Sequence, residues 1–216
     1  MTEQMIKAQI LDNTEIARDV FLLSIPRTID FKPGQVIRLR IDGNEPRLYS
    51  IASGNREKEL KILYDIKPEG KVTPLIKELR KGDCISISEA FGEFTDQDKS
   101  AFWIANGTGI APFYAMFRSG LGQGKTLIHG GRYRDSFYFQ DEFESFFNER
   151  YIRCCSLETD DGIFHGRLTQ YLSAQNFLPP DQKYYLCGSA EMVVETRDIL
   201  ISKKIPFKNI ISEIYF

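Results

Sequence analysis

Short runs in which hydrophobic and polar residues alternate fill the first part of the chain, and glycines separate them. Ile37, Leu39 and Ile41 alternate with arginines, and residues 60–64 and 85–87 repeat this pattern. A period of two predicts strands that bury one face and expose the other. Because the runs recur at short intervals, they predict an antiparallel barrel.

One helix is expected to cap this barrel. Thr73 is a suitable N-cap, Pro74 suits the first helical position, and Gly82 can end the segment. The apolar residues between them share one helical face, which predicts that the helix packs against the barrel.

After residue 97 the pattern changes to apolar runs that alternate with amphipathic stretches, as is typical of a parallel sheet covered by helices. Strands are expected at residues 101–105, 126–130, 151–156, 184–187 and 210–215, and helices at residues 140–150 and 191–203. The sequence therefore predicts a two-domain β + α/β fold. An antiparallel β-barrel domain covers residues 1–97, and a parallel-sheet α/β domain covers residues 98–216.

The composition is that of an ordinary globular protein. Of 216 residues, 42% are hydrophobic and 27% are charged, and 28 basic against 30 acidic residues leave a net charge of −2. This balance argues against nucleic acid as a partner. The chain starts without a signal-peptide pattern, and its longest uncharged stretch, residues 100–117, contains two glycines and Pro112. We therefore expect a cytoplasmic protein without membrane insertion.

The cysteines and histidines do not have the spacing of a metal site or a disulfide framework. The four cysteines include no Cys-x-x-Cys pair, and this usage suits a reducing compartment. His129 and His165 lie far apart in the sequence, and neither begins a ligand-spaced motif. Neither a bound metal nor a disulfide is expected.

The sharpest local signal is an apolar strand, residues 102–106, that turns through Gly107, Thr108 and Gly109 into a helix containing Pro112. Such a turn lets backbone amides approach a diphosphate at a helix N-terminus. It differs from the Rossmann G-x-G-x-x-G pattern, because Pro112 stands where the third glycine would be. Taken alone, the turn is equally well an ordinary tight connection.

Three further places carry candidate chemistry. Cys187–Gly188 ends a predicted strand at the sheet edge where open α/β folds bind ligands, although a single cysteine there is more often inert core. Arg47 and Tyr49 share one face of a short strand, and they can hold a phosphate and a planar ligand or form a plain exposed strand with a salt bridge. Gly70–Thr73 offers a phosphate site or an ordinary helix cap.

Together and in this order, these motifs resemble the ferredoxin-NADP reductase family over nearly the whole chain. The resemblance implies a barrel that binds FAD rather than FMN and an α/β domain that binds NADPH or NADH. It also implies that Arg47 binds a flavin phosphate, that Tyr49 packs on the isoalloxazine and that Ser50 hydrogen-bonds near flavin N5. The flavin-binding residues expected from it are Arg47, Leu48, Tyr49, Ser50, Tyr64, Gly70, Lys71, Val72 and Thr73.

The same resemblance assigns the nucleotide and the chain end. Gly107, Thr108, Gly109 and Pro112 are expected to bind the nucleotide diphosphate, and Cys187 and Gly188 to lie beside the nicotinamide. The ending Glu213-Ile214-Tyr215-Phe216 is similar to the family's terminal Glu-x-Tyr, with one extra aromatic residue. Tyr215 is expected to cover the flavin, although Phe216 can take that place or stack on the adenine. The expected catalytic residues are thus Ser50, Cys187, Glu213 and Tyr215.

Nucleotide choice depends on arginines. Bacterial members of the family hold the 2′-phosphate of NADP with three arginines, of which Arg132 and Arg167 match the first and third, while Leu157 replaces the second. Losing one charge-assisted contact costs about 1.5 to 3 kcal/mol. The two remaining arginines favour NADPH narrowly, although both also suit a solvated surface.

The resemblance implies hydride transfer between NAD(P)H and FAD, with electrons passing on to a separate ferredoxin or flavodoxin. A monomer is expected. Basic residues near the predicted helix can dock an acidic carrier or form a solvated face; they are Lys67, Lys71, Lys77, Arg80 and Lys81. Two alternatives remain: a reductase of free flavin or of an oxygenase component, and a non-catalytic flavin or nucleotide sensor.

Overall fold

The computed structural model describes residues 5–41, 43–67 and 69–215, except for the side chain of Tyr215. The chain forms two compact units. The first comprises the residues up to Asp96 together with Ala111–Leu121, and the second comprises Gln97–Ile110 and the residues from Gly122 onward. The predicted fold class, antiparallel β followed by parallel α/β, is confirmed. The boundary between residues 97 and 98 stays a prediction.

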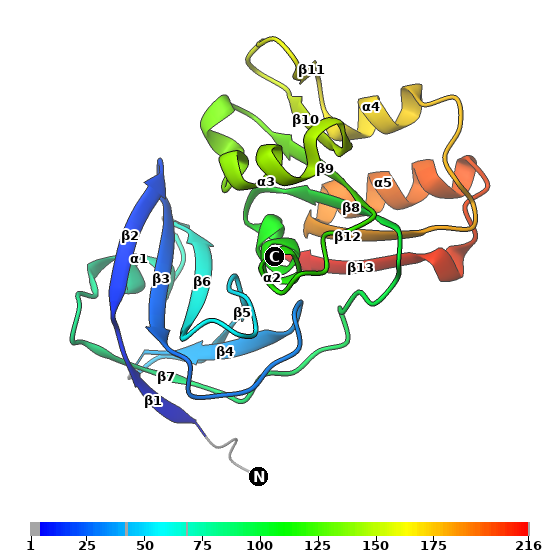
Figure 1. Cartoon of the computed structure of the whole chain (residues 1–216). Coiled ribbons are helices and arrows are strands. Elements are labelled where there is room, and N and C mark those ends of the chain that lie inside the picture. The colour runs from blue at the N-terminus through cyan, green and yellow to red at the C-terminus, as the bar shows by residue number, and fades with distance from the viewer. Residues whose placement is uncertain (1–4, 42, 68, 216) are drawn as a thin grey trace. The chain divides into compact units, whose positions relative to one another are not determined.

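Two antiparallel sheets form the first unit (Figure 1). One has the order β1(Ile6–Gln9), β7(Cys84–Ile87), β4(Val36–Arg40), β5(Arg47–Ser50), and the other β2(Asp12–Ala17), β3(Val20–Pro26), β6(Glu59–Asp65). An antiparallel bridge between Ile51 and Ile62 joins them. Apolar residues from both sheets enclose a single core, in which Leu23, Ile37 and Leu60 are fully buried.

Ser86 in β7 and Ser88 directly after the strand are buried, contrary to the solvent-exposed face that the alternation predicts. Ser86 is 5% and Ser88 1% exposed. The Ser88 hydroxyl accepts a hydrogen bond from the Arg38 N–H at 2.9 Å and donates one to the Glu89 carbonyl at 2.7 Å. Because these bonds satisfy the hydroxyl, it can be buried without a large penalty.

The helix of this unit, α1(Thr73–Glu78), begins and ends differently from the prediction. Val72 rather than Thr73 is the N-cap, and no side chain caps the first turn. The Thr73 hydroxyl instead accepts a hydrogen bond from the Lys67 N–H at 2.9 Å, which closes the preceding loop. The helix ends well before Gly82, which has φ +99° and turns the chain toward β7.

A second helix, α2(Ala111–Arg118), follows the glycine-rich turn and belongs to the first unit. Arg118 Nε pairs with Glu57 Oε1 at 2.9 Å. A Cβ on Gly54 would lie 2.7 Å from the Arg118 carbonyl oxygen, so only glycine permits this approach. The loop around Gly54 therefore fixes the end of α2.

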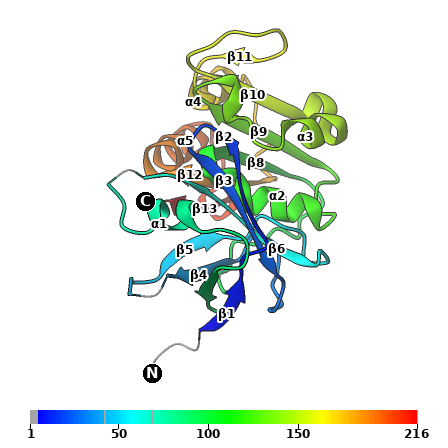
Figure 2. The same cartoon turned by 90° about the vertical axis from the view of Figure 1, so that its left-hand side faces the viewer.

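Six parallel strands form the second unit (Figures 1 and 2). Their order is β11(Phe164–His165), β10(Tyr151–Cys155), β9(Lys125–Gly131), β8(Ala101–Asn106), β12(Lys183–Ser189), β13(Ile210–Tyr215). The helix α3(Gln140–Phe147) covers one face, and α4(Leu168–Ala174) and α5(Ala190–Ser202) cover the other. All five predicted strands are present, whereas β11 and α4 have no counterpart among the expected elements.

The predicted helix over residues 140–150 is shorter than expected. It ends at Phe147 because Asn148 adopts φ +49°, and a 3-10 turn, Asn148–Arg150, leads into β10. The other predicted helix, over residues 191–203, is α5. None of the helices in the described residues has the length and hydrophobicity needed to cross a membrane.

A polar cluster at the start of the sheet ties the chain entering the second unit to β12. The Asp98 carboxylate accepts a hydrogen bond from the Tyr185 hydroxyl at 2.8 Å and pairs with Lys183 Nζ at 3.2 Å. Lys125 Nζ, on a lysine that is 1% exposed, donates to the Asp98 carbonyl. Burial disfavours the charged carboxylate, but the bonds from Tyr185 and Lys183 outweigh it and lower the pKa of Asp98.

We expect Asp98→Asn to lower the free energy of unfolding at pH 7 by about 1 to 2 kcal/mol. A carboxylate whose pKa is lowered by folding stabilises the protein above its ordinary pKa, and this stabilisation is lost as pH falls through the folded-state pKa. The gap between wild type and variant should therefore shrink below about pH 4. Urea unfolding at pH 7 and pH 3 measures it. Asp161→Asn, at an exposed carboxylate without a described partner, is the control, and an equal loss there would contradict the assignment.

Candidate functional site

Four of the expected flavin residues, Arg47–Ser50, form β5, an edge strand of the four-stranded sheet. Arg47 is exposed and makes no ion pair with any residue that the structure describes. Leu48 is 60% exposed, Tyr49 is half-buried against the barrel core, and Ser50 is 3% exposed. An available guanidinium, an accessible apolar side chain and a ring thus follow one another on an open strand edge.

Tyr64 on β6 supports Tyr49 from the core. Its ring stacks on Phe21 with centroids 5.5 Å apart, and its hydroxyl donates to Asn13 Oδ1 at 2.9 Å. Burial raises the pKa of Tyr64 to about 12, and burial together with the neighbouring Tyr64 raises that of Tyr49. Both phenols therefore stay protonated at neutral pH, and Tyr64 is a structural support with 2% exposure.

The loop at residues 70–73 precedes α1. Lys71 is exposed, Val72 is 4% exposed, and the Gly70 N–H donates to the Lys67 carbonyl at 2.8 Å. A Cβ on Gly70 would lie 3.0 Å from the Lys67 carbonyl oxygen, so this is a tight turn. Because Thr73 Oγ1 already accepts a bond from Lys67, its remaining hydrogen is the group available to a ligand.

In the second unit, the glycine-rich turn is a 3-10 turn, Gly107–Ile110, at the carboxyl end of β8. A Cβ on Gly109 would lie 2.6 Å from the Cys187 carbonyl carbon and 2.6 Å from Gly188 Cα. Gly107 has φ +54°, and nothing lies within 4 Å of the position of its Cβ. The turn is therefore pressed against β12 at Gly109 and open to solvent or a ligand at Gly107.

Asn106 joins the ends of β8 and β12, a role that the sequence analysis missed. Its Oδ1 accepts from the Ser189 N–H at 2.9 Å, and its Nδ2 donates to Ser189 Oγ at 3.2 Å. A Cβ on Gly188, which has φ +151°, would overlap Asn106 Oδ1. The structure thus brings the two predicted nucleotide segments, residues 107–109 and 187–188, together. The asparagine directly before the first glycine is the signal in the sequence that could have indicated this contact.

Two of the remaining expected catalytic residues lie side by side in the sheet. Cys187 is fully buried in β12, and Glu213 in β13 is its register partner. Backbone pairing continues to Ser189 and Tyr215 at the end of both strands. The side chain of Tyr215 and the whole of Phe216 lie outside the described residues, so the roles predicted for them stay predictions.

The arginines expected at the 2′-phosphate differ in their surroundings. Arg132 follows β9, is exposed and has no ion-pair partner in the described part of the chain. Arg167 Nη1 pairs with Glu191 Oε1 at 2.8 Å, and both side chains are largely exposed. Leu157 is 59% exposed at the position of the missing arginine.

A third arginine, which the sequence analysis did not consider, contacts acidic residues beside Leu157. The Arg134 N–H donates to Glu158 Oε2 at 2.7 Å, and Arg134 Nη1 pairs with Asp160 Oδ2 at 2.9 Å. The hydrogen bond and charge of Arg134 lower the pKa of Asp160. The charged form of the Asp160 carboxylate is thus favoured near the end of β9.

Comparisons with known proteins agree with both units. The oxidoreductase FAD-binding domain matches residues 6–95, and the oxidoreductase NAD-binding domain matches residues 103–198. The structure is similar to a ferredoxin NADP+ reductase from Neisseria gonorrhoeae with bound FAD and NADP, with a TM-score of 0.86 and 22% identity over 98% of this chain and 99% of that one.

Two curated relatives are electron-transfer components. A probable dihydroorotate dehydrogenase B (NAD(+)) electron transfer subunit from Pyrococcus furiosus is 30% identical over 90% of this chain and 74% of that protein. The toluate 1,2-dioxygenase electron transfer component from Pseudomonas putida is 28% identical over 87% of this chain and 60% of its own length. The chain belongs to the family of oxidoreductases with an FAD-binding and an NAD-binding domain, and its fold is that of ferredoxin-NADP+ reductases.

Proposed function

We propose that this chain passes electrons from NADH, through FAD bound on the first unit, to a separate protein. The flavin-dependent oxidoreductase activity follows from the family. We propose in addition that the electron donor is NADH, and we propose which residues bind the two cofactors. The observation that carries it is the turn at Gly107–Gly109, which is open at one glycine and held against β12 at the other.

The residues present fit both groups. On β5, the exposed Arg47 can pair with a flavin phosphate, while Leu48 and Tyr49 offer apolar and aromatic surface to a planar ring. In the second unit, nothing lies within 4 Å of the position of a Cβ on Gly107, so the turn has room there for a diphosphate. Gly70, Lys71 and Thr73 complete the proposed flavin site, and Thr108 and Pro112 the proposed diphosphate loop.

When bound, the nicotinamide supplies a hydride that the flavin accepts, and the flavin can release its electrons one at a time. The protein contributes binding, orientation and electrostatics. We assign Ser50 to orienting the flavin edge, Cys187 and Gly188 to shaping the nicotinamide site, and Glu213 to charge balance. Tyr49 has its phenol held protonated, so it acts as a neutral packing surface.

We propose NADH rather than NADPH, because carboxylates lie beside the position expected for the 2′-phosphate of NADP. Their repulsion of the phosphate outweighs the attraction of the nearby arginines. Glu158 and Asp160 would repel a 2′-phosphate, whereas a carboxylate accepts a hydrogen bond from a ribose 2′-hydroxyl. Arg134 and Arg167 are each already paired with carboxylates. Arg132 is the remaining expected arginine without such a partner among the described residues.

Leu157→Arg should shift the preference toward NADPH by about 10-fold or more, since it restores one charge-assisted phosphate contact. Leu157 is 59% exposed, so the arginine is accommodated without repacking. The ratio of kcat/KM values for NADPH and NADH measures the shift. Ile201→Arg, at a 45% exposed position on α5, is the matched control. A similar shift in both variants would contradict a phosphate contact at residue 157.

The absorption spectrum of the purified protein, recorded anaerobically before and after each nucleotide, tests the function. Flavin bands that NADH bleaches faster than NADPH are expected. Faster bleaching by NADPH would refute the nucleotide choice but not the reductase. Flavin that neither nucleotide reduces would indicate a sensor, and a colourless protein that still reduces added flavin would indicate a free-flavin reductase.

Ferredoxin or flavodoxin is the proposed acceptor, and a cytoplasmic monomer the proposed form. The basic cluster near α1 is partly neutralised, because Lys67 pairs with Asp65 at 2.6 Å and Arg80 Nη2 lies 3.8 Å from Glu78. Lys71 and Lys81 are exposed and have no ion-pair partner among the described residues. Electron transfer to an acidic carrier should therefore slow as salt rises, measured by stopped-flow absorbance. A rate that salt leaves unchanged would contradict docking through these lysines.

A further inference from the structure

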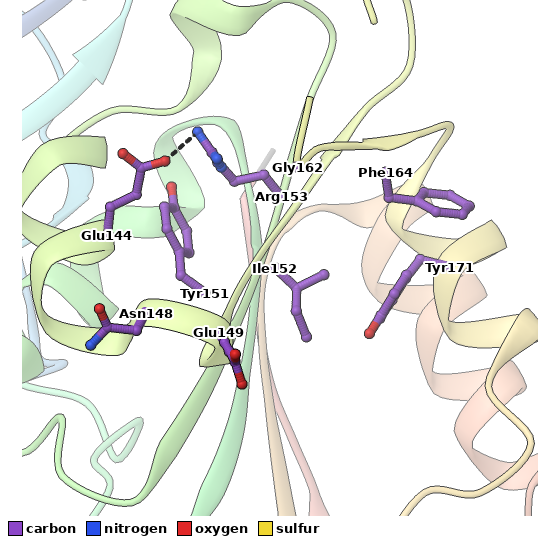
Figure 3. Close-up of a pocket in the computed structure, with 9 residues that line it drawn as sticks. All are labelled: Glu144, Asn148, Glu149, Tyr151, Ile152, Arg153, Gly162, Phe164 and Tyr171. Carbon is purple, nitrogen blue, oxygen red and sulfur yellow. Dashed lines mark ion pairs between the residues drawn. The ribbon is translucent and has the colours of Figure 1, made fainter. Parts of the chain in front are cut away.

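A cavity of about 480 Å³ lies in the second unit, at the start of β10 (Figure 3). It is lined by Glu144, Asn148, Glu149, Tyr151, Ile152, Arg153, Gly162, Phe164 and Tyr171. None of these residues belongs to the proposed flavin or nucleotide sites. We call this cavity the edge groove.

The edge groove crosses the outer edge of the sheet. Tyr151 and Arg153 point to the face covered by α3, where the Tyr151 ring lies 5.6 Å from that of Phe143 and Arg153 pairs with Glu144 at 2.5 Å. Ile152 points to the opposite face, toward Phe164 and Tyr171. Because residues on both faces line one cavity, its floor is the strand edge between them.

That strand edge is unpaired in the part of the chain that the structure describes. The neighbouring strand β11 has only two residues, which pair with Cys154 and Cys155. The Gly166 N–H donates to the Cys155 carbonyl on this side, so Arg153, two residues earlier, directs its own N–H the same way. No strand in the described part of the chain pairs with residues 151–153 on this side, and Arg153 Nε is buried without a hydrogen-bond acceptor.

The two walls of the edge groove differ in chemistry. On the α3 side, the acids Glu144 and Glu149 face one base, Arg153, which leaves a net charge of −1. Arg153 already pairs with Glu144, whereas Glu149 has no described partner. On the α4 side, Phe164 and Tyr171 meet edge to face with centroids 5.4 Å apart. One wall suits a cation and the other an apolar side chain.

We propose that the edge groove binds an extended segment of a partner protein as an added β-strand, with cationic and apolar side chains in alternation. An added strand uses the unpaired backbone edge, and its alternate side chains reach the two faces of the sheet. The cationic side chains of the added strand contact Glu149 and Glu144. Its apolar side chains contact Ile152, Phe164 and Tyr171. The negative charge disfavours a phosphate-bearing ligand at this place.

The edge groove lies on the nucleotide-binding unit and is separate from the residues assigned to the electron path. A partner can therefore be tethered there without blocking the nucleotide turn. The proposal does not depend on which nucleotide or acceptor the protein uses, so its test and the spectral test of function fail independently.

The probe is a fluorescein-labelled peptide of sequence Val-Lys-Val-Lys-Val-Lys, titrated with the FAD-loaded protein in fluorescence anisotropy. We expect saturable 1:1 binding. Glu149→Lys should weaken it about fivefold or more, because attraction becomes repulsion. Glu195→Lys, an exposed reversal on α5, should leave it unchanged. Reduction of FAD by NADH should be the same in both variants, which shows that both are folded.

Two N-methylated peptides distinguish strand addition from other binding. One carries methyl groups on all lysine amides and the other on all valine amides. In an added strand only alternate amides face the groove, so one peptide should lose at least tenfold in affinity while the other retains it. No binding of the parent peptide, equal affinities of the two methylated peptides, or equal effects of the two charge reversals would each overturn the proposal.

Discussion

Replacing Gly109 with alanine is expected to weaken the binding of NADH strongly while FAD stays bound. The new Cβ would lie 2.6 Å from the carbonyl carbon of Cys187 and from Gly188 Cα. Both are backbone atoms of β12, a strand paired on both sides with β8 and β13, so neither can move without disturbing the sheet. The turn must therefore move away from β12, and the amides proposed to bind the diphosphate move with it.

We expect the KM for NADH to rise at least about 100-fold, which corresponds to roughly 2.7 kcal/mol of lost binding. The flavin spectrum should be unchanged, because the proposed FAD residues lie in the first unit. Stopped-flow reduction at increasing NADH concentration, with the oxidised spectrum as the starting point, measures both quantities in one experiment.

Gly107→Ala is the matched control for this effect. Gly107 has φ +54°, but no atom lies within 4 Å of the position of its Cβ. The alanine there meets only the strain of the left-handed conformation, roughly 1 to 2 kcal/mol, and no backbone has to move. KM should therefore change much less than in Gly109→Ala. Equal losses in the two variants would show that the contact with β12 does not position the turn.

The sequence predicts the parallel unit better than the barrel, and strand burial explains the difference. The five strands from residue 101 onward are apolar runs between helical stretches, so their pattern is local. In the barrel, β3 is buried along nearly its whole length and therefore shows no alternation. The two-residue strand β11 is too short to carry any pattern. Its existence depends on pairing with Cys154 and Cys155.

The candidate site is predictable where backbone shape determines it. Gly107 and Gly109 are visible in the sequence because glycine suits both places: Gly107 has a positive φ, and Gly109 has no room for a Cβ. The N-cap of α1 cannot be predicted from the sequence, because the Thr73 hydroxyl has two possible hydrogen-bond partners. It accepts a bond from the Lys67 N–H instead of capping the helix. The pairing of Arg134 with Asp160 is also invisible, because it joins segments 26 positions apart through the geometry of β9 and β10. That pairing is the reason that we propose NADH, whereas a count of arginines favours NADPH.

Removal of the Arg47 side chain is expected to weaken FAD binding about 10- to 150-fold, the range for loss of one charge-assisted phosphate contact. Arg47 is exposed on the edge strand β5 and pairs with no described carboxylate. Arg47→Ala therefore leaves no buried partner unsatisfied, and the free energy of unfolding without FAD should change by less than about 0.5 kcal/mol. The substitution therefore lowers the affinity for FAD and not the stability of the fold.

Titration of FAD into the flavin-free protein, followed by quenching of flavin fluorescence, measures the affinity. Arg18→Ala removes another exposed arginine, from the turn between β2 and β3, and it should bind FAD as the wild type does. Arg47→Lys should lie between the two, because an ammonium keeps the charge but loses the planar fork that bonds two phosphate oxygens at once. Wild-type affinity in Arg47→Ala would mean that other groups hold the phosphate. The open edge of β5 would then contribute only the apolar surface of Leu48 and Tyr49 to the flavin site.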